Sequence, residues 1–184
     1  MDRPLAVPAL FAGFTLIEML IALVIVAILL TAASPPLAAW LQDNRLVAQI
    51  NRLNGTLQLA RTEAIKRGAT VTVCSSSNGA SCGGLWKDGW IILAGATLIQ
   101  TYGALSADTT LHYTLAAGTP ASTLLFDSRG FSTDYAGTWS LCDSRGSAHA
   151  RGLVMTGSGR VVKARDVTMN GIPEDGQGND LSCP

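Results

Sequence analysis

Residues 13–33 read GFTLIEMLIALVIVAILLTAA, and the organisation of the rest of the chain follows from them. Between Phe14 and Ala33 the only charged side chain is Glu18, and there is no Gly or Pro. As a helix rising about 1.5 Å per residue, this run would be about 30 Å long, the thickness of the hydrocarbon core of a bilayer. Apolar residues occur on every side of such a helix, so we expect lipid or other helices to surround it.

The single acid, Glu18, is the unusual feature of this run. A carboxylate in the middle of an apolar span costs roughly 2.5 to 3.5 kcal/mol on insertion scales, so it needs a partner. Glu18 lies in the first turn of the expected helix, where the positive end of the helix dipole offsets part of that cost. A free amino group on Phe14 would offset more, and cleavage after Gly13 would create one.

The GFTLIE motif of residues 13–18 resembles the processing site of type IV pilins and type II secretion pseudopilins. The resemblance implies that a prepilin peptidase cleaves after Gly13 and that Phe14 is then N-methylated. It also implies that Glu18 pairs with the amine of a neighbouring subunit as the filament assembles. An ordinary signal anchor would not explain Glu18. Cleavage by signal peptidase near residues 31–33, which would release a periplasmic domain, is the weakest alternative.

The expected helix meets two prolines, Pro35 and Pro36, just after the apolar run. A proline inside a helix removes a hydrogen bond and clashes with the preceding turn, so we expect a kink or a break there. Helical periodicity then resumes, with Gly68 as a suitable C-cap. Spacings of three and four place one apolar stripe on this half of the helix: Leu46, Ile50, Leu53, Leu57, Ala60 and Ala64. We interpret the stripe as core for the following domain rather than as a partner-binding face.

After Gly68 the pattern changes to short β-strands separated by turns rich in Gly, Ser, Asn and Asp. The fold class is therefore α+β: a long N-terminal helix, with a transmembrane half and an amphipathic half, packed on an antiparallel β-sheet domain. We expect a leader at 1–13, a transmembrane or filament-core helix at 14–34, an amphipathic helix at 35–68 and a periplasmic β domain at 69–184. The expected strands are 69–74, 89–94, 98–102, 110–115, 123–127, 138–142, 152–156 and 160–165.

The four cysteines indicate an oxidising compartment. They allow three pairings, and we favour Cys74–Cys82 with Cys142–Cys183. In the chain-entropy model these bonds contribute about 2.6 and about 4 kcal/mol, and the second would pin a Gly/Asp-rich tail. The cysteines form no metal-ligand pattern with the two isolated histidines, so no metal or other cofactor is expected. Disulfides place the β domain outside the cytoplasm.

Most of the chain resembles the GspH/FimT family of minor pilins and pseudopilins. The resemblance rests on LARTEAIKRG at 59–68, VTVCSS at 71–76, DGWIIL at 88–93, FDSRG at 126–130 and GSGRV at 157–161. It implies a subunit in the tip or priming complex of a type IV pilus or a type II secretion pseudopilus, anchored in the bacterial inner membrane by a single span with its C-terminal domain in the periplasm. The expected partners are prepilin peptidase and other minor and major pilins or pseudopilins. No catalytic constellation is apparent, so we do not expect an enzyme.

The alternative hypothesis is DNA capture during natural transformation. From Arg129 to Arg165 the chain has six basic residues against two acids, although its net charge is zero. FimT-like minor pilins bind DNA through a Gly-Arg-x-Arg motif. Gly159 and Arg160 match it, but Val162 stands at the second arginine position, followed by Lys163 and Arg165. On a regular strand Lys163 and Arg165 share a face that Arg160 does not, and four acids from Asp166 onward could screen the patch. We therefore favour the structural role over binding of double-stranded DNA.

Overall fold

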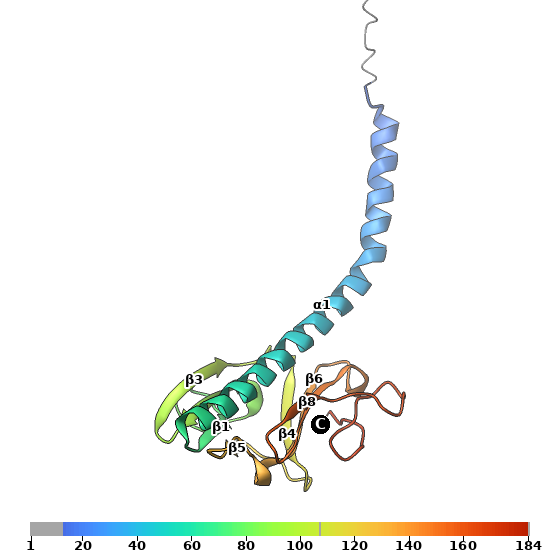
Figure 1. Ribbon diagram of the computed structural model, residues 1–184. Coiled ribbons are helices and arrows are strands. Elements are labelled where there is room, and N and C mark those ends of the chain that lie inside the picture. Colours follow the sequence, from blue (N-terminus) through green and yellow to red (C-terminus); the bar gives the residue numbers. More distant parts are fainter. Residues whose placement is uncertain (1–12, 107, 184) are drawn as a thin grey trace, which may run out of the picture. The chain divides into compact units, whose positions relative to one another are not determined.

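The structure, a computed structural model, describes residues 13–106 and 108–183, with only the backbone described for residues 32–35. It divides into two compact units, Met1–Leu41 and Gln42–Pro184. Helix α1, Leu16–Arg67, belongs to both units, and every β-strand belongs to the second (Figure 1). The predicted leader lies outside the described residues except for Gly13, and the predicted domain boundaries stay predictions.

The first unit consists of the N-terminal part of α1 and the residues that precede it. Its described side chains from Gly13 to Thr31 are all exposed, including every large apolar one. Among the described residues, no single helix has the length and hydropathy of a bilayer span, but Leu16–Thr31 and Pro36–Arg67 meet that requirement together as a bent pair. The backbone is helical throughout Leu16–Arg67, and the predicted role of Pro35 and Pro36 in kinking this helix stays a prediction.

In the second unit, α1 presents the predicted apolar stripe to the core of the β domain. All six stripe residues are at most 3% exposed: Leu46, Ile50, Leu53, Leu57, Ala60 and Ala64. Their interpretation as core is therefore confirmed. Thr56 lies on the same face, and its hydroxyl accepts a bond of 3.1 Å from the indole Nε1 of Trp90, which joins the helix to the sheet.

The C-terminus of α1 is closed by the glycine that the sequence predicts. Gly68 adopts φ +61°, and its N–H donates to the carbonyl of Ile65, while the N–H of Ala69 donates to the carbonyl of Ala64. These two bonds form a Schellman motif, which satisfies carbonyls that the helix leaves free. The chain turns directly from this cap into the first strand.

Across residues 13–106 and 108–183, eight strands form two four-stranded antiparallel sheets, in the order β3-β2-β1-β5 and β4-β6-β7-β8. The strands are β1 Val71–Ser75, β2 Gly89–Ala94, β3 Thr97–Gly103, β4 Thr110–Leu115, β5 Thr123–Phe126, β6 Gly137–Cys142, β7 Arg151–Met155 and β8 Val161–Lys163. All eight predicted strands are present, so the predicted α+β fold is confirmed. The last strand is shorter than predicted, because Arg160, Ala164 and Arg165 lie outside it.

Residues from α1 and from both sheets meet in one hydrophobic core. At its centre the rings of Tyr113 and Trp139 stack, with centroids 3.9 Å apart, and Trp86 meets both edge-on. The Trp86 indole donates to the carbonyl of Ala121 at 2.7 Å, so its polar atom is satisfied inside the core. A smaller cluster of Cys142, Ala150 and Leu181 anchors the C-terminal tail, residues 166–183, on the second sheet.

Candidate assembly segment and basic groove

The residues of the predicted processing site lie at the very start of helix α1. Gly13, Phe14 and Thr15 precede the helix, and Phe14 is 88% exposed. A Cβ built on Gly13 would meet no atom within 4 Å, so the fold itself does not require glycine there. Glu18 is exposed in the first helical turn, as predicted. The Gly13–Phe14 bond, predicted as the cleavage site, and Glu18 therefore both lie on the surface of the first unit.

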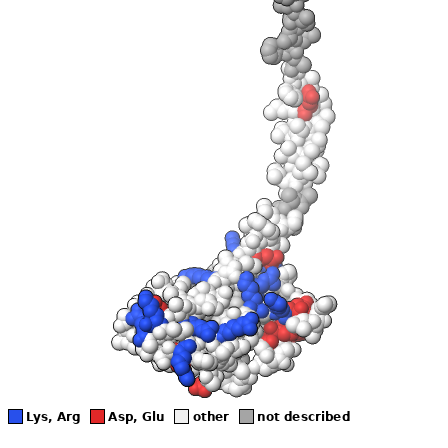
Figure 2. Space-filling view, viewed as in Figure 1, with Lys and Arg blue, Asp and Glu red and all other residues white. Residues whose placement is uncertain are grey.

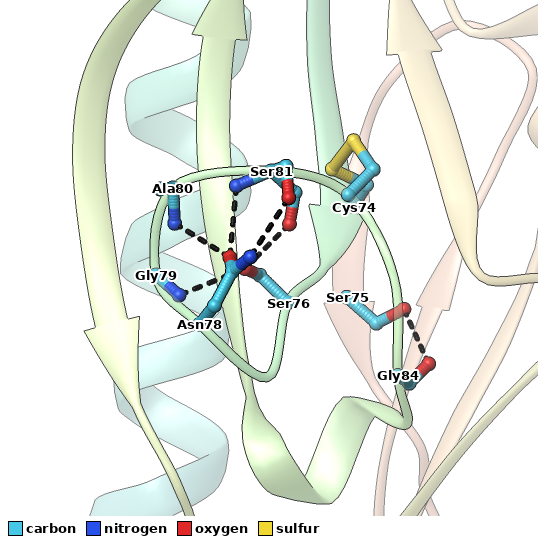
Figure 3. Close-up of a disulfide and its surroundings, with 9 residues drawn as sticks. Cys74, Ser75, Ser76, Asn78, Gly79, Ala80, Ser81 and Gly84 are labelled. Atoms are coloured by element: carbon cyan, nitrogen blue, oxygen red, sulfur yellow. Dashed lines mark hydrogen bonds between the residues drawn. A yellow bond between two sulfur atoms is a disulfide. The ribbon is translucent and has the colours of Figure 1, made fainter.

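Two disulfides join the predicted cysteines, Cys74 to Cys82 and Cys142 to Cys183. The first closes a loop rich in Ser and Gly (Figure 3). The hydroxyl of Ser76 donates to the carbonyl of Ser81 inside this loop at 2.7 Å, and that of Ser75 donates to the carbonyl of Gly84, just after the loop, at 2.9 Å. Both hydroxyls therefore bond to nearby backbone carbonyls and stabilise this polar segment.

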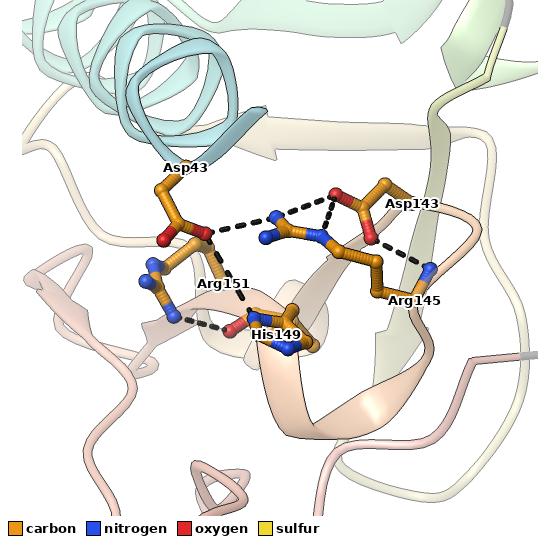
Figure 4. A network of polar contacts seen from close by, with 6 residues as sticks. Asp43, Asp143, Arg145, His149 and Arg151 are labelled. Carbon is orange, nitrogen blue, oxygen red and sulfur yellow. Dashed lines mark hydrogen bonds and ion pairs between the residues drawn. The ribbon is translucent and has the colours of Figure 1, made fainter. Parts of the chain in front are cut away.

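A polar network in the second unit links α1 to the β6–β7 connection (Figure 4). One guanidinium nitrogen of Arg145 lies 2.8 Å from Oδ1 of Asp43 and 2.7 Å from Oδ2 of Asp143. His149 Nδ1 lies 3.8 Å from the same oxygen of Asp43. Burial acts to raise the pKa of Asp143, but hydrogen bonds from the side chain and backbone of Arg145 outweigh it, so this pKa is lowered. The network is a structural clamp, and it uses one of the basic residues counted in the sequence.

The six basic residues of 129–165 therefore do not form one free surface. Arg129 forms an ion pair of 3.2 Å with Asp127, and Arg145 belongs to the network just described. Basic side chains still gather on the face of the second unit seen in Figure 2. None of the ion pairs found in the described residues includes Arg160, Lys163 or Arg165. These three side chains are exposed.

The same three cations line one groove of about 570 Å³, formed by β7, β8 and the C-terminal tail. The sequence interpretation, a regular strand from 160 to 165, separates Arg160 from the other two. In the structure Arg160 precedes the strand, in a turn where the N–H of Gly159 donates to the carbonyl of Thr156. The chain leaves the strand after Lys163, and the three residues line a common groove. Val154 and Val162 supply apolar lining.

The acids of the C-terminal tail have structural roles. Glu174 is 4% exposed and accepts bonds from the backbone N–H groups of Thr168 and Val167, at 2.8 and 2.6 Å, which lower its pKa. The other three accept bonds from backbone or side-chain amides of the tail itself: Asp166, Asp175 and Asp180. Glu174 and Asp175 line the groove, but within the described residues neither pairs with its cations. Sequence counting alone could not reveal that these carboxylates fold the tail.

Comparisons with known families define the class of this protein. The family model described as type II transport protein GspH matches residues 49–159, which is more than half of the chain. The family model of the prokaryotic N-terminal methylation motif matches residues 10–34. The chain belongs to the GspH family and is a type IV minor pilin or pseudopilin. This family and its fold are those of structural pilin subunits rather than of enzymes.

Solved structures with the same fold include the type IV minor pilin FimU of Pseudomonas aeruginosa (strain PAO1), in two crystal forms. One matches with a TM-score of 0.54 and 21% identity, covering 68% of this chain and 92% of that one. The other gives 0.50 and 20%, covering 65% and 93%. No curated protein matched the chain. The likeness to FimU confirms the pilin fold, with its long helix on an antiparallel β domain.

Proposed function

We propose that the chain is cleaved after Gly13 by prepilin peptidase, N-methylated on Phe14 and assembled as a minor subunit into the tip or priming complex of a type IV pilus or type II secretion pseudopilus. Cleavage adds water across the peptide bond, which leaves a carboxylate on Gly13 and an amino group on Phe14. The observation that carries this proposal is the exposed Gly13–Phe14 bond directly before an apolar helix whose first turn contains Glu18.

The role we assign to Glu18 in assembly follows from its surroundings. Every other described side chain between Phe14 and Thr31 is uncharged, and all of them are exposed, so this part of α1 offers a surface for lipid or for other helices. A carboxylate in such a surface is stabilised by an opposite charge. The new amine of a neighbouring subunit supplies that charge, and the pair fixes the axial register of the two helices.

The apolar helix and the two disulfides also support a cellular location for the protein. We place residues 14–34, with the N-terminal part of helix α1, in the inner membrane before assembly, as a single span, with the β domain in the periplasm. Two disulfides within the second unit require an oxidising compartment for that unit.

Two variants test this proposal in the organism. Gly13→Ala introduces no clash within the chain, so a block of cleavage in that variant reports recognition by the peptidase. N-terminal sequencing should find the parent beginning at Phe14 and the variant retaining its leader in the membrane. Glu18→Val should be cleaved but should not copurify with the other minor subunits. Mature Gly13→Ala protein, or normal recruitment of Glu18→Val, would refute the corresponding step.

The basic groove favours a second function, capture of double-stranded DNA. Three cations that form no ion pair with any described residue line it, and phosphate binding requires such a group on one surface. Near-complete binding of three phosphates predicts that the logarithm of the binding constant falls with that of salt concentration with a slope of about −2.7. A mobility-shift titration of the unit from Gln42 onward measures this slope.

Matched variants separate the groove from net charge in that titration. Lys163→Ala should weaken binding and reduce the salt slope by about 1. Arg129→Ala removes an equal charge that is already paired with Asp127, so it should leave binding unchanged. If the parent does not bind DNA at low salt, DNA capture is refuted. If Lys163→Ala and Arg129→Ala lose the same amount of DNA affinity, the groove is not the binding site.

A further inference from the structure

The first turn of helix α1 is held by a reciprocal pair of hydrogen bonds. The backbone N–H of Glu18 donates to Oγ1 of Thr15 at 3.2 Å, and the backbone N–H of Thr15 donates to a carboxylate oxygen of Glu18 at a longer 3.5 Å. The first helical backbone bond runs from the N–H of Met19 to the carbonyl of Thr15, at 3.2 Å. Thr15 is therefore the N-cap of α1, and Thr15 with Glu18 forms a capping box.

This cap determines where the helix begins. An N-cap residue has non-helical backbone angles, so the helix starts at Leu16 and the residues before it stay outside. Gly13, Phe14 and Thr15 have no helical assignment and are exposed. The Gly13–Phe14 peptide bond is thus one residue away from the cap and free of helical hydrogen bonds.

We infer that Thr15 is a positioning residue for processing: its hydroxyl stops the helix at Leu16 and so keeps the Gly13–Phe14 bond available to the peptidase. The inference rests on the proposed cleavage after Gly13. Peptidases act on locally unfolded backbone, and the rate of cleavage follows the population of that open form when opening is fast. Without the cap, a helix start at Leu16 is less stable relative to an earlier one, and the helix extends toward the scissile bond.

The two bonds of the cap assign separate tasks to the backbone and the side chain of Glu18. The shorter bond uses the backbone N–H of Glu18, which any residue at that position keeps. The longer bond uses the carboxylate, which assembly requires for the amine of a neighbour. Thr15 can therefore hold the helix start while the Glu18 carboxylate changes partner. Processing should depend on the side chain of Thr15, and assembly on the charge of Glu18.

The experiment follows cleavage of the full-length precursor by prepilin peptidase in membranes, measured as kcat/KM. Thr15→Val keeps the shape of the side chain but removes its acceptor, and we expect about a fivefold fall, which corresponds to about 1 kcal/mol for an N-cap. Thr15→Ser should restore the parent rate. Thr15→Asn, an equally good N-cap of different shape, should restore it as well, which separates capping from recognition of the hydroxyl by the peptidase.

Two further measurements make the outcome decisive. Amide hydrogen exchange at Glu18 should accelerate in Thr15→Val and return to the parent rate in Thr15→Ser, which shows directly that the cap was lost and regained. Glu18→Gln keeps a capping-box acceptor, so it should be cleaved at the parent rate yet fail to assemble.

Cleavage of Thr15→Val at the parent rate, with its Glu18 amide exchanging fast, would overturn the inference. So would failure of both Thr15→Ser and Thr15→Asn to restore the rate. Blocked cleavage of Gly13→Ala beside normal cleavage of Thr15→Val would reject the role of Thr15 and keep the processing site. Normal cleavage of Gly13→Ala would reject the processing site itself.

Discussion

Removal of the Cys142–Cys183 disulfide should destabilise the second unit more than removal of the Cys74–Cys82 disulfide. The two bonds close loops with sequence separations of 41 and 8 residues. In the chain-entropy model the longer loop contributes about 4 kcal/mol and the shorter about 2.6 kcal/mol, because a cross-link removes more freedom from a longer unfolded segment. The first value is a large fraction of the stability of a typical domain, about 5 to 15 kcal/mol.

The structure adds a local consequence for the tail. Leu181 is 2% exposed and packs in the small cluster with Ala150 and Cys142. Besides that cluster, the tail is joined to distant parts of the unit by bonds from the N–H of Gly176 to Oγ1 of Thr138 and from Nε2 of Gln177 to the carbonyl of Ala116, both at 3.3 Å. We therefore expect the variant without the long-loop bond to lose protection in the tail before the sheets unfold.

The assay is urea unfolding of the fragment from Gln42 onward, with each cysteine pair replaced by alanine. Hydrogen exchange on the same samples reports the tail separately from the sheets. A loss below about 1 kcal/mol for the Cys142/Cys183 pair, or a larger loss for the Cys74/Cys82 pair, would refute the loop-entropy reasoning. Early exchange of the strands together with the tail would refute the local argument.

Two further predictions concern single positions in the second unit. A Cβ at Gly159 would clash with the carbonyl oxygen of Gly130, whereas a Cβ at Gly171, which also has positive φ, would meet nothing within 4 Å. In thermal unfolding, Gly159→Ala should therefore lower Tm much more than Gly171→Ala does. Equal decreases in Tm would show that the clash has no effect on stability. The pKa of Asp143 is lowered in the folded state, so its ionised carboxylate stabilises the fold at pH values above the ordinary aspartate pKa, about 3.9. This stabilisation is lost as the pH falls through the pKa of Asp143 in the folded state. The difference in free energy of unfolding between the parent and Arg145→Gln should accordingly shrink from pH 5 toward pH 2, and a constant difference over that range would contradict the assignment.

The periodic features of the chain could be predicted from its sequence. The stripe that begins at Leu46 follows a spacing of three and four, and burial confirms each member. The strands follow short β-prone runs between turn residues, and all eight are present. Gly68 ends the helix because its positive φ suits a C-cap. Each of these signals is local, so the neighbouring residues alone determine it.

Apart from the Cys142–Cys183 pair, partners distant in the chain could not be predicted. Asp43 and Arg145 are 102 residues apart, and no pattern near either one indicates the other. A count of charges therefore overestimated the free basic surface, because Arg145 is in the clamp. The tail acids could be counted from the sequence, but not their partners: Glu174 and Asp175 line the groove while their carboxylates accept bonds from amides of the tail, and screening of the cations by these acids stays a prediction. The groove of Arg160, Lys163 and Arg165 depends on where β8 ends, and strand ends are weakly specified by sequence.

The two proposed activities lie in different compact units, so they can be separated by mutation. Glu18 belongs to the first unit, and Lys163 belongs to the second. If both proposals hold, Glu18→Gln should abolish assembly, and DNA binding, which the isolated second unit carries without Glu18, should not depend on that residue. Lys163→Ala should weaken DNA binding and leave assembly unchanged. A loss of assembly in Lys163→Ala would instead mean that the groove contacts another subunit. In that case the basic residues of the groove would act in filament formation, and they would no longer support DNA capture.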